Sequence, residues 1–195
     1  MKSLLTLFNA IQFLNDKDSS IERIIYIRAN VDNLEESSLG ALPGDLNSKI
    51  KPLAYPVLDN LFCFMKECDA NLLIDEGKIE VLPLSMLRGR SLNYSFIIVD
   101  ECQNTSPKTM KTILTRLGQS SKMVLIGDTT QCDTKLGYFN NGLSDLISRL
   151  SSLIKSPRFD QYGEPLPFPV GLIPFSLDDI IRNESIKWIL NMYDS

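Results

Sequence analysis

Two stretches of this sequence decide its fold: Phe96-Ile97-Ile98-Val99-Asp100-Glu101 and Met123-Val124-Leu125-Ile126-Gly127-Asp128. Each starts as an apolar run and ends in acid, and runs of this kind are typical of strands buried on both faces in a parallel α/β sheet. Ligands bind just beyond the carboxyl ends of such strands. Acids at two adjacent strand ends therefore predict a site for Mg2+ and a water beside phosphates, as a nucleoside-triphosphate hydrolase needs.

Composition narrows the class of protein. The chain has 195 residues, 44% of them hydrophobic, which is enough for one domain over residues 1–195 with a real core. It contains no His, which excludes Ser-His-Asp triads and most zinc sites. Its four Cys lack CxxC spacing and are interpreted as reduced thiols. The net charge is -4 and no apolar run approaches the ~20 residues of a membrane span, so we expect a soluble, cytoplasmic chain without membrane contact.

Strand and helix patterns alternate along the chain, which predicts a parallel sheet flanked by helices. The spacing predicts strands at 24–27, 79–82, 96–100, 123–126 and 170–175. It predicts helices at 4–14, after Asp45, again after Pro56, at about 69–76, after Thr105-Ser106-Pro107 with a stop at Gly118, at 143–150 and at 178–193. We expect loops at 30–43 and 155–169 and a basic turn at 88–90.

The two strand ends carry the candidate chemistry. A strand ending in Asp-Glu has the form of a Walker B element, in which Asp100 holds Mg2+ and Glu101 polarises the attacking water. Solvated acids at a strand end are the alternative for Asp-Glu alone. The second end adds Gly127, which allows close backbone approach, and Gln131, an amide suited to touch a γ-phosphate or its water. Together the two ends indicate a nucleotide site.

Several segments resemble the PhoH family of predicted P-loop ATPases. They are residues 96–105, 114–118 and 121–133, with 42–49, 86–90 and 180–182 matching in the same order, so the resemblance covers nearly the whole chain except 155–169. The resemblance implies a RecA-like core, ATP and Mg2+ as ligands, and ATP hydrolysis that is sometimes coupled to RNA unwinding. It also places Gln103 and Asp128 among the nucleotide-binding residues.

One part of the P-loop pattern is missing. The chain contains no G-x-x-x-x-G-K-[ST], whose backbone N–H groups cradle phosphates at a helix N-terminus. It starts Met1-Lys2-Ser3, directly before the first predicted helix. We interpret Lys2 and Ser3 as the end of a Walker A motif truncated within its loop, with Lys2 reaching the β- and γ-phosphates and Ser3 ligating Mg2+. An ordinary starting dipeptide is the alternative.

The resemblance also places a central strand before the P-loop, between the 170–175 strand and the 123–126 strand. Without it two strand edges lack ladder partners, and such edges invite pairing with other chains. We therefore expect a homo-oligomer or completion by an N-terminal fragment, and a split gene and a mis-assigned start both stay open.

Two arginine-bearing segments are secondary candidates. Arg182 matches a family arginine that could serve as an arginine finger, with an ordinary surface role as the alternative. Arg88 and Arg90 either contact nucleotide or RNA phosphate or form a solvated turn. The leading interpretation is an ATP-binding protein whose Mg-dependent hydrolysis is impaired in this chain alone, with RNA as a candidate partner. The alternative is a non-catalytic interaction module that docks onto a complete partner.

Overall fold

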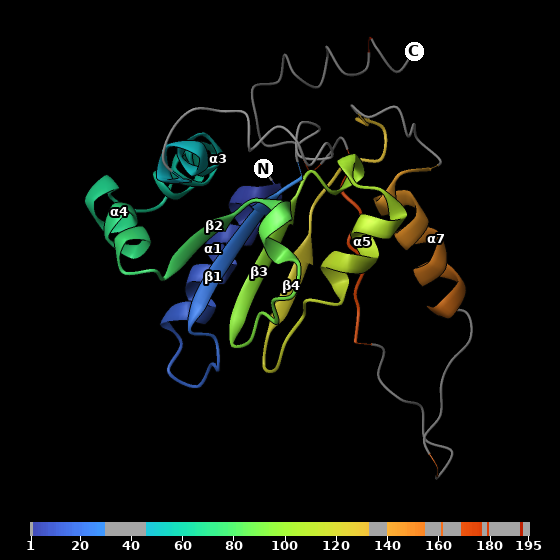
Figure 1. Cartoon of the computed structure of the whole chain (residues 1–195), viewed down its shortest axis with the longest axis horizontal. Coiled ribbons are helices and arrows are strands. Elements are labelled where there is room, and N and C mark those ends of the chain that lie inside the picture. The colour runs from blue at the N-terminus through green and yellow to red at the C-terminus, as the bar shows by residue number, and fades with distance from the viewer. Residues whose placement is uncertain are drawn as a thin grey trace. The chain divides into compact units, whose positions relative to one another are not determined.

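The computed structural model describes residues 2–29, 46–132, 140–154, 161, 169–176, 179 and 192. The chain divides into two compact units, one of residues 2–150 and one that contains residues 151–195. The first unit holds the sheet, the candidate site and nearly all of the described helices (Figure 1).

Four parallel strands form the sheet: β1 (Arg23–Arg28), β2 (Ile79–Leu82), β3 (Ser95–Asp100) and β4 (Lys122–Leu125). Their spatial order is β2-β1-β3-β4 (Figure 1). Arg28 pairs with Asp100 and Val99 pairs with Leu125, so the carboxyl ends of β1, β3 and β4 meet at one edge of the sheet. The predicted parallel α/β architecture is confirmed, and it is consistent with a RecA-like P-loop fold.

The strands differ in burial. All six residues of β3 are buried, as the apolar run predicts for an interior strand. In β4, Lys122 is exposed and the next three residues are only half-buried, so the strand is less buried than the apolar run predicts, although Val124 packs against one core and Met123 and Leu125 pack against the other. The reason is its position, because β4 is the last strand of the sheet that the described residues form.

Three helices cover one face of the sheet: α1 (Lys2–Asn15), α3 (Leu46–Leu61) and α4 (Glu67–Asp75). Ile24 and Tyr26 of β1 belong to the core beneath them. The two helices expected after Asp45 and after Pro56 are one continuous helix, α3, which contains both Pro52 and Pro56. A proline inside a helix costs about 3 kcal/mol, and the complete burial of Val57 and Leu61 in this core offsets that cost.

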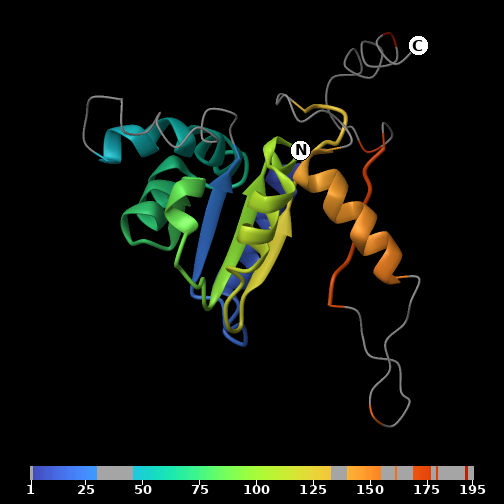
Figure 2. The ribbon, with the colours of Figure 1, turned by 45° about the vertical axis from the view of Figure 1, so that its right-hand side comes forward.

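The other face is covered by η2 (Leu84–Leu87), η3 (Cys102–Asn104), α5 (Pro107–Leu114) and α7 (Gly142–Ile154). Ile25 and Ile27 of β1 point into this second core, so successive residues of one strand serve both faces. Figure 2 shows α1 behind the strands and α5 in front of them.

Helix α5 begins as predicted and ends differently. The Ser106 hydroxyl caps it by accepting a hydrogen bond from the Thr109 N–H at 3.1 Å, and Pro107 occupies the first turn. The helix ends at Leu114, with Thr115 as its C-cap, so the expected stop at Gly118 is wrong. Gly118 serves another purpose, because a Cβ there would lie 2.7 Å from the backbone of Leu92.

The expected strand at Val170–Phe175 is not formed. Residues 169–176 have no regular secondary structure and are exposed. Pro169 and Pro174 lack the N–H donors that a sheet ladder requires, and no described strand pairs with this segment. The expected loop at 30–43, the loop at 155–169 except for residues 161 and 169, and all of the 178–193 helix except Asp179 and Met192 lie outside the described residues. Among the helices of the described part, none has the length and hydropathy needed to span a bilayer.

Candidate functional site

The start of α1 meets the ends of β3 and β4. Lys2 Nζ donates a hydrogen bond of 2.9 Å to the Gly127 carbonyl, just beyond β4. Ser3 Oγ donates one of 2.9 Å to Asp100 Oδ2 at the end of β3. A lysine and a hydroxyl that are separated from the strand ends by about a hundred residues in sequence are thus brought onto the predicted acidic edge.

Asp100 is held by three donors. Besides Ser3, the Tyr26 hydroxyl donates to Oδ2 at 2.5 Å, and the Glu101 N–H donates to Oδ1 at 3.0 Å. The carboxylate is nearly buried, with 9% of the residue exposed. Burial, and then the charge of Asp100, raise the pKa of Tyr26, so its hydroxyl remains a hydrogen-bond donor. Tyr26 is not among the site residues predicted from the sequence. The only indication for it was a side chain with a polar hydroxyl in the otherwise apolar run of β1.

Glu101 has an unusual backbone. It lies in the left-handed region with φ 58° and ψ 40°, directly after β3 and before η3. Such a conformation costs a residue with a side chain about 1–2 kcal/mol, and strain of this kind concentrates at functional sites. Glu101 Oε2 accepts a hydrogen bond of 2.7 Å from Gln103 Nε2, and Oε1 lies 3.9 Å from Arg28 Nη2.

Gln103 links the two strand ends. Its Nε2 donates to Glu101 and to the Gln131 carbonyl at 3.0 Å, and its Oε1 accepts from the Asp128 N–H at 3.1 Å. Only 1% of the residue is exposed. The resemblance implies that Gln103 binds nucleotide, but in this structure both its Nε2 and its Oε1 are hydrogen-bonded to protein groups. These bonds link the end of β3 to the segment that follows β4.

Close packing around position 127 requires a glycine there. A Cβ at this position would lie 2.7 Å from Gln103 Oε1 and 2.6 Å from Leu143 Cδ2. In this structure the groups that approach Gly127 closely are the Gln103 and Leu143 side chains, and the predicted approach of a nucleotide stays a prediction.

The segment after Gly127 forms a turn. Asp128 Oδ1 accepts from the Thr130 N–H at 3.0 Å and from the Thr130 hydroxyl at 2.7 Å. Partial burial raises the pKa of Asp128, but the Thr130 hydrogen bonds and the charge of Lys2 lower it more, so the pKa lies below its ordinary value. The Gln131 N–H donates to the Asp128 carbonyl at 3.2 Å, and the Gln131 side chain is exposed.

The structure therefore brings eight of the nine predicted site residues to one edge of the sheet: Lys2, Ser3, Asp100, Glu101, Gln103, Gly127, Asp128 and Gln131. The ninth, Arg182, lies outside the described residues. No group of three acidic, His or Cys side chains able to hold a metal occurs in the described ranges. A pair of oxygen ligands from Ser3 and Asp100 suits Mg2+, which is usually held by one or two carboxylates together with waters and phosphate oxygens.

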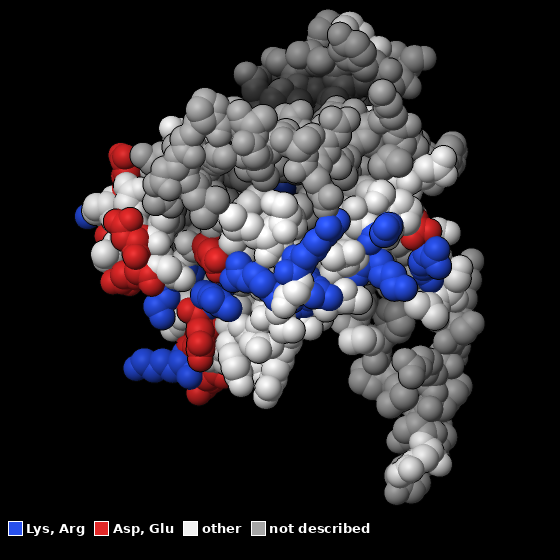
Figure 3. Space-filling model, in the orientation of Figure 1, with Lys and Arg blue, Asp and Glu red and all other residues white. Residues whose placement is uncertain are grey.

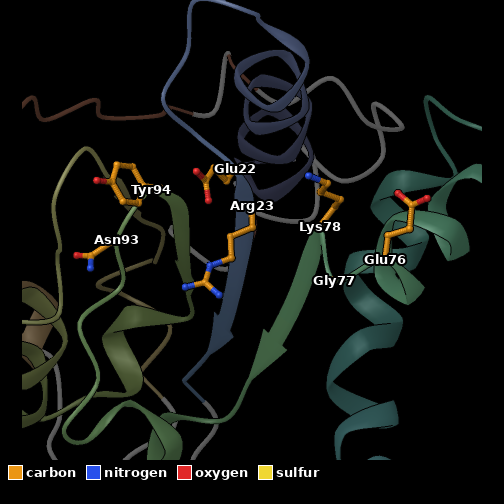
Figure 4. Close-up of a pocket in the computed structure, with 7 residues that line it drawn as sticks. All are labelled: Glu22, Arg23, Glu76, Gly77, Lys78, Asn93 and Tyr94. Atoms are coloured by element: carbon orange, nitrogen blue, oxygen red, sulfur yellow. The ribbon is translucent and has the colours of Figure 1, made fainter.

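A pocket of about 350 Å³ lies at the opposite edge, where the strands begin (Figure 4). The residues that line it are Glu22, Arg23, Glu76, Gly77, Lys78, Asn93 and Tyr94. Its acids and bases are mixed, and Arg23 Nε already donates to Ser95 Oγ at 3.1 Å. None of the predicted site residues lines it.

Comparison with known proteins decides the family. A family model described as PhoH-like protein matches residues 1–194. The chain belongs to the PhoH-like family. This family is generally one of ATP-binding proteins of the P-loop NTPase kind.

Several curated PhoH-like relatives are similar to this chain. A PhoH-like protein of Synechocystis is 43% identical over 142 residues, which cover 73% of this chain and 42% of that protein. A PhoH-like protein of Bacillus subtilis is 34% identical over 193 residues, covering 99% and 54%. Protein PhoH of Escherichia coli K12 is 33% identical over 197 residues, covering 98% and 49%. The chain thus spans about half the length of the curated relatives that it matches.

Proposed function

We propose that this chain binds ATP with Mg2+ at the carboxyl ends of β3 and β4 and takes part in ATP hydrolysis. One observation carries the proposal: Lys2 and Ser3, at the start of α1, contact the residues at the two strand ends, Gly127 and Asp100, at 2.9 Å each. A lysine, a hydroxyl and a carboxylate at a helix start beside strand ends match the parts from which P-loop NTPases build their site for nucleotide and magnesium.

Each side chain has a defined task in this proposal. Lys2 leaves the Gly127 carbonyl to reach the β- and γ-phosphates, and Asp100 and Ser3 hold Mg2+. The bound metal would neutralise charge on the phosphates. Glu101 orients and polarises the attacking water for in-line displacement, while Gln131 contacts the γ-phosphate or that water. Gln103 holds Glu101 and the turn at Asp128 in fixed positions relative to each other. Arg182 is assigned a supporting role as an arginine finger.

Hydrolysis by these 195 residues alone is expected to be weak. The sequence contains no glycine-rich G-x-x-x-x-G loop, and phosphate positioning supplies a large part of the rate in such reactions. An upstream segment that carries such a loop would provide backbone N–H groups for the phosphates. Coupling to RNA and a cytoplasmic location are further parts of the proposal.

ATP binding is tested by titrating a fluorescent ATP analogue with and without Mg2+. Lys2→Ala should weaken binding at least tenfold, because it removes the cation that contacts the phosphates. Lys17→Ala removes an exposed lysine elsewhere and should leave binding unchanged. Equal effects of the two variants would exclude Lys2 from the site.

Hydrolysis is tested by phosphate release from this chain and from a chain extended upstream by a glycine-rich loop. The extension should raise turnover, and Glu101→Gln in the extended chain should lower it by about 10²–10⁴-fold with binding retained, as expected for loss of a general base. Turnover that survives Glu101→Gln would contradict the proposed role.

A non-catalytic interaction module is the second candidate. It is favoured by the outer edge of β4, which has no strand partner within the described residues. If neither the chain nor its extended form binds ATP, this second function replaces the first.

A further inference from the structure

Charge is strongly segregated along this sequence. Residues 81–99 and 102–127 contain six Lys or Arg and no Asp or Glu, in a chain whose net charge is -4. Lys122 is one of the six and lies 5.0 Å above the ring of Phe13, a residue of α1 on the other face of the sheet. The remaining five define what we call the basic band: Arg88, Arg90, Lys108, Lys111 and Arg116.

The basic band lies on the layer formed by η2 and α5. Leu87 and Leu92, which flank the Arg88–Arg90 turn, and Met110 and Ile113 of α5 pack into the same core. Helix α5 turns these apolar residues inward, which leaves Lys108 and Lys111 exposed. Figure 3 shows blue Lys and Arg side chains in a row across this face.

The turn and the helix are joined by hydrogen bonds. Arg116 Nη1 donates to the Arg90 carbonyl at 3.2 Å, and the Leu92 N–H donates to the Arg116 carbonyl at 2.9 Å. These bonds place Arg88 and Arg90 of the turn beside Lys108 and Lys111 of α5 and beside Arg116, which follows the helix. The backbone segments that carry the basic band are therefore joined, and its cations belong to one surface.

Acids in the described part of the chain pair with some of these cations and not with others. Glu80 pairs with Arg90 at 3.3 Å and also lies 3.9 Å from Arg23. Lys108, Lys111 and Arg116 form no ion pair with any acid in the part of the chain that the structure describes. The band keeps a positive charge on a protein that is negative overall, and such a surface attracts a polyanion.

We propose that the basic band binds the phosphate backbone of a double-stranded nucleic acid. Exposed Ser91, Thr115 and Gln119 accompany the cations, and hydroxyl and amide side chains of this kind contact phosphate oxygens together with Lys and Arg. Surfaces that bind single strands add aromatic side chains on which bases stack. Residues 84–93 and 105–120 contain no Phe, Tyr or Trp, and Tyr94, whose N–H donates to the Gln119 carbonyl, lies beside them with 36% of the residue exposed. The basic band itself therefore lacks stacking rings, which favours a duplex over a single strand.

The basic band is a different surface from the proposed ATP site, and duplex binding there deepens the proposed coupling to RNA. The acidic strand ends bind a metal and phosphates at the edge of the sheet, whereas the basic band lies on the helical layer that covers one face. Duplex binding requires neither ATP nor Mg2+, so it is measured without nucleotide. Failure of this proposal and failure of the proposed hydrolysis are therefore separate results.

The test is fluorescence anisotropy with a short labelled RNA duplex at several salt concentrations. The double variant Lys108→Gln/Lys111→Gln should weaken binding at least tenfold at low salt. It should also reduce the slope of log affinity against log salt by about 2, one for each lost phosphate contact. The matched control Lys17→Gln/Lys122→Gln removes two exposed lysines from elsewhere and should match the unmodified chain.

Three results would overturn the proposal. They are equal binding by the double variant and the control, tighter binding of the matched single strand than of the duplex, and equally effective competition by polyglutamate. Circular dichroism of each variant verifies that it is folded, since both exchanged pairs are exposed and should leave the fold intact.

Discussion

The Tyr26 hydroxyl donates a hydrogen bond of 2.5 Å to Asp100 Oδ2, across the paired strands β1 and β3. The same oxygen accepts from Ser3 at 2.9 Å. Two donors on one oxygen hold the carboxylate in a single orientation at the end of β3. Tyr26 is fully buried and belongs to the core beneath α1, so the orientation of the acidic strand end depends on the packing of the sheet.

Tyr26→Phe should destabilise the protein. The variant keeps the ring in the core and removes only the donor to a charged group, a loss of about 1.5–3 kcal/mol. Urea unfolding of the variant measures the change in free energy of unfolding. Tyr55→Phe is the matched control, because Tyr55 is 60% exposed and should tolerate the same change. Equal stability of the two variants would show that the Tyr26 hydroxyl contributes nothing.

Two substitutions of Gln103 test the hydrogen bonds that its Nε2 donates and the one that its Oε1 accepts. Gln103→Leu leaves Glu101 without its 2.7 Å donor and the Asp128 N–H without its acceptor, and should cost about 1–3 kcal/mol. Gln103→Glu still accepts from Asp128 but sets a second carboxylate beside Glu101. Its stability should therefore recover as the pH is lowered and the carboxylates are protonated, whereas that of Gln103→Leu should not. Urea unfolding at two pH values compares them, and parallel behaviour would contradict the assigned contacts.

Gly127→Ala should be destabilising through overpacking. The new Cβ would lie within 2.7 Å of both Gln103 and Leu143, and crowding of this kind costs about 1–3 kcal/mol. Gly171→Ala is a suitable control, because nothing lies within 4 Å of a Cβ there. Thermal unfolding of the two variants gives the comparison, and an unchanged midpoint for Gly127→Ala would show that the neighbours yield without cost.

Glu101 provides a test of backbone strain. Glu101→Gly and Glu101→Ala both lose the contacts of the side chain, but only glycine adopts φ 58° without steric penalty. The glycine variant should be the more stable of the two by about 1 kcal/mol. Denaturant titration of the pair measures the difference, and a more stable alanine variant would mean that the turn relaxes once the side chain is gone.

Asp128 should make stability depend on pH in the acid range. Its pKa is lower in the folded protein than in the unfolded chain, so the folded state favours the carboxylate. The stability that this provides is present above the unfolded pKa of about 4 and is lost as the pH falls through the folded value. Asp128→Asn should thus lower stability at neutral pH and have less effect in acid. If Asp128→Asn lowered the free energy of unfolding by the same amount at neutral and at acid pH, the lowered pKa of Asp128 would be contradicted.

Local patterns were sufficient for much of the fold. The apolar runs at β1, β2 and β3 and the spacing of α1 appear in the structure where the sequence predicts them. The exceptions involve proline and long-range packing. Pro56 marks a helix boundary in the sequence, yet α3 continues through it because Val57 and Leu61 are buried beneath. The apolar run at 170–175 forms no strand, because a strand needs a partner that its own residues do not supply.

The sequence by itself determined the parallel sheet, the acidic ends of β3 and β4 and the residues that belong to the candidate site, because hydrophobic periodicity and short motifs are local properties. Only the tertiary structure decided how that site is held. The Tyr26 contact with Asp100 and the bonds from Gln103 to both strand ends join residues of different strands and turns. Such contacts depend on which strands become neighbours and on which side chains burial leaves within reach of one another.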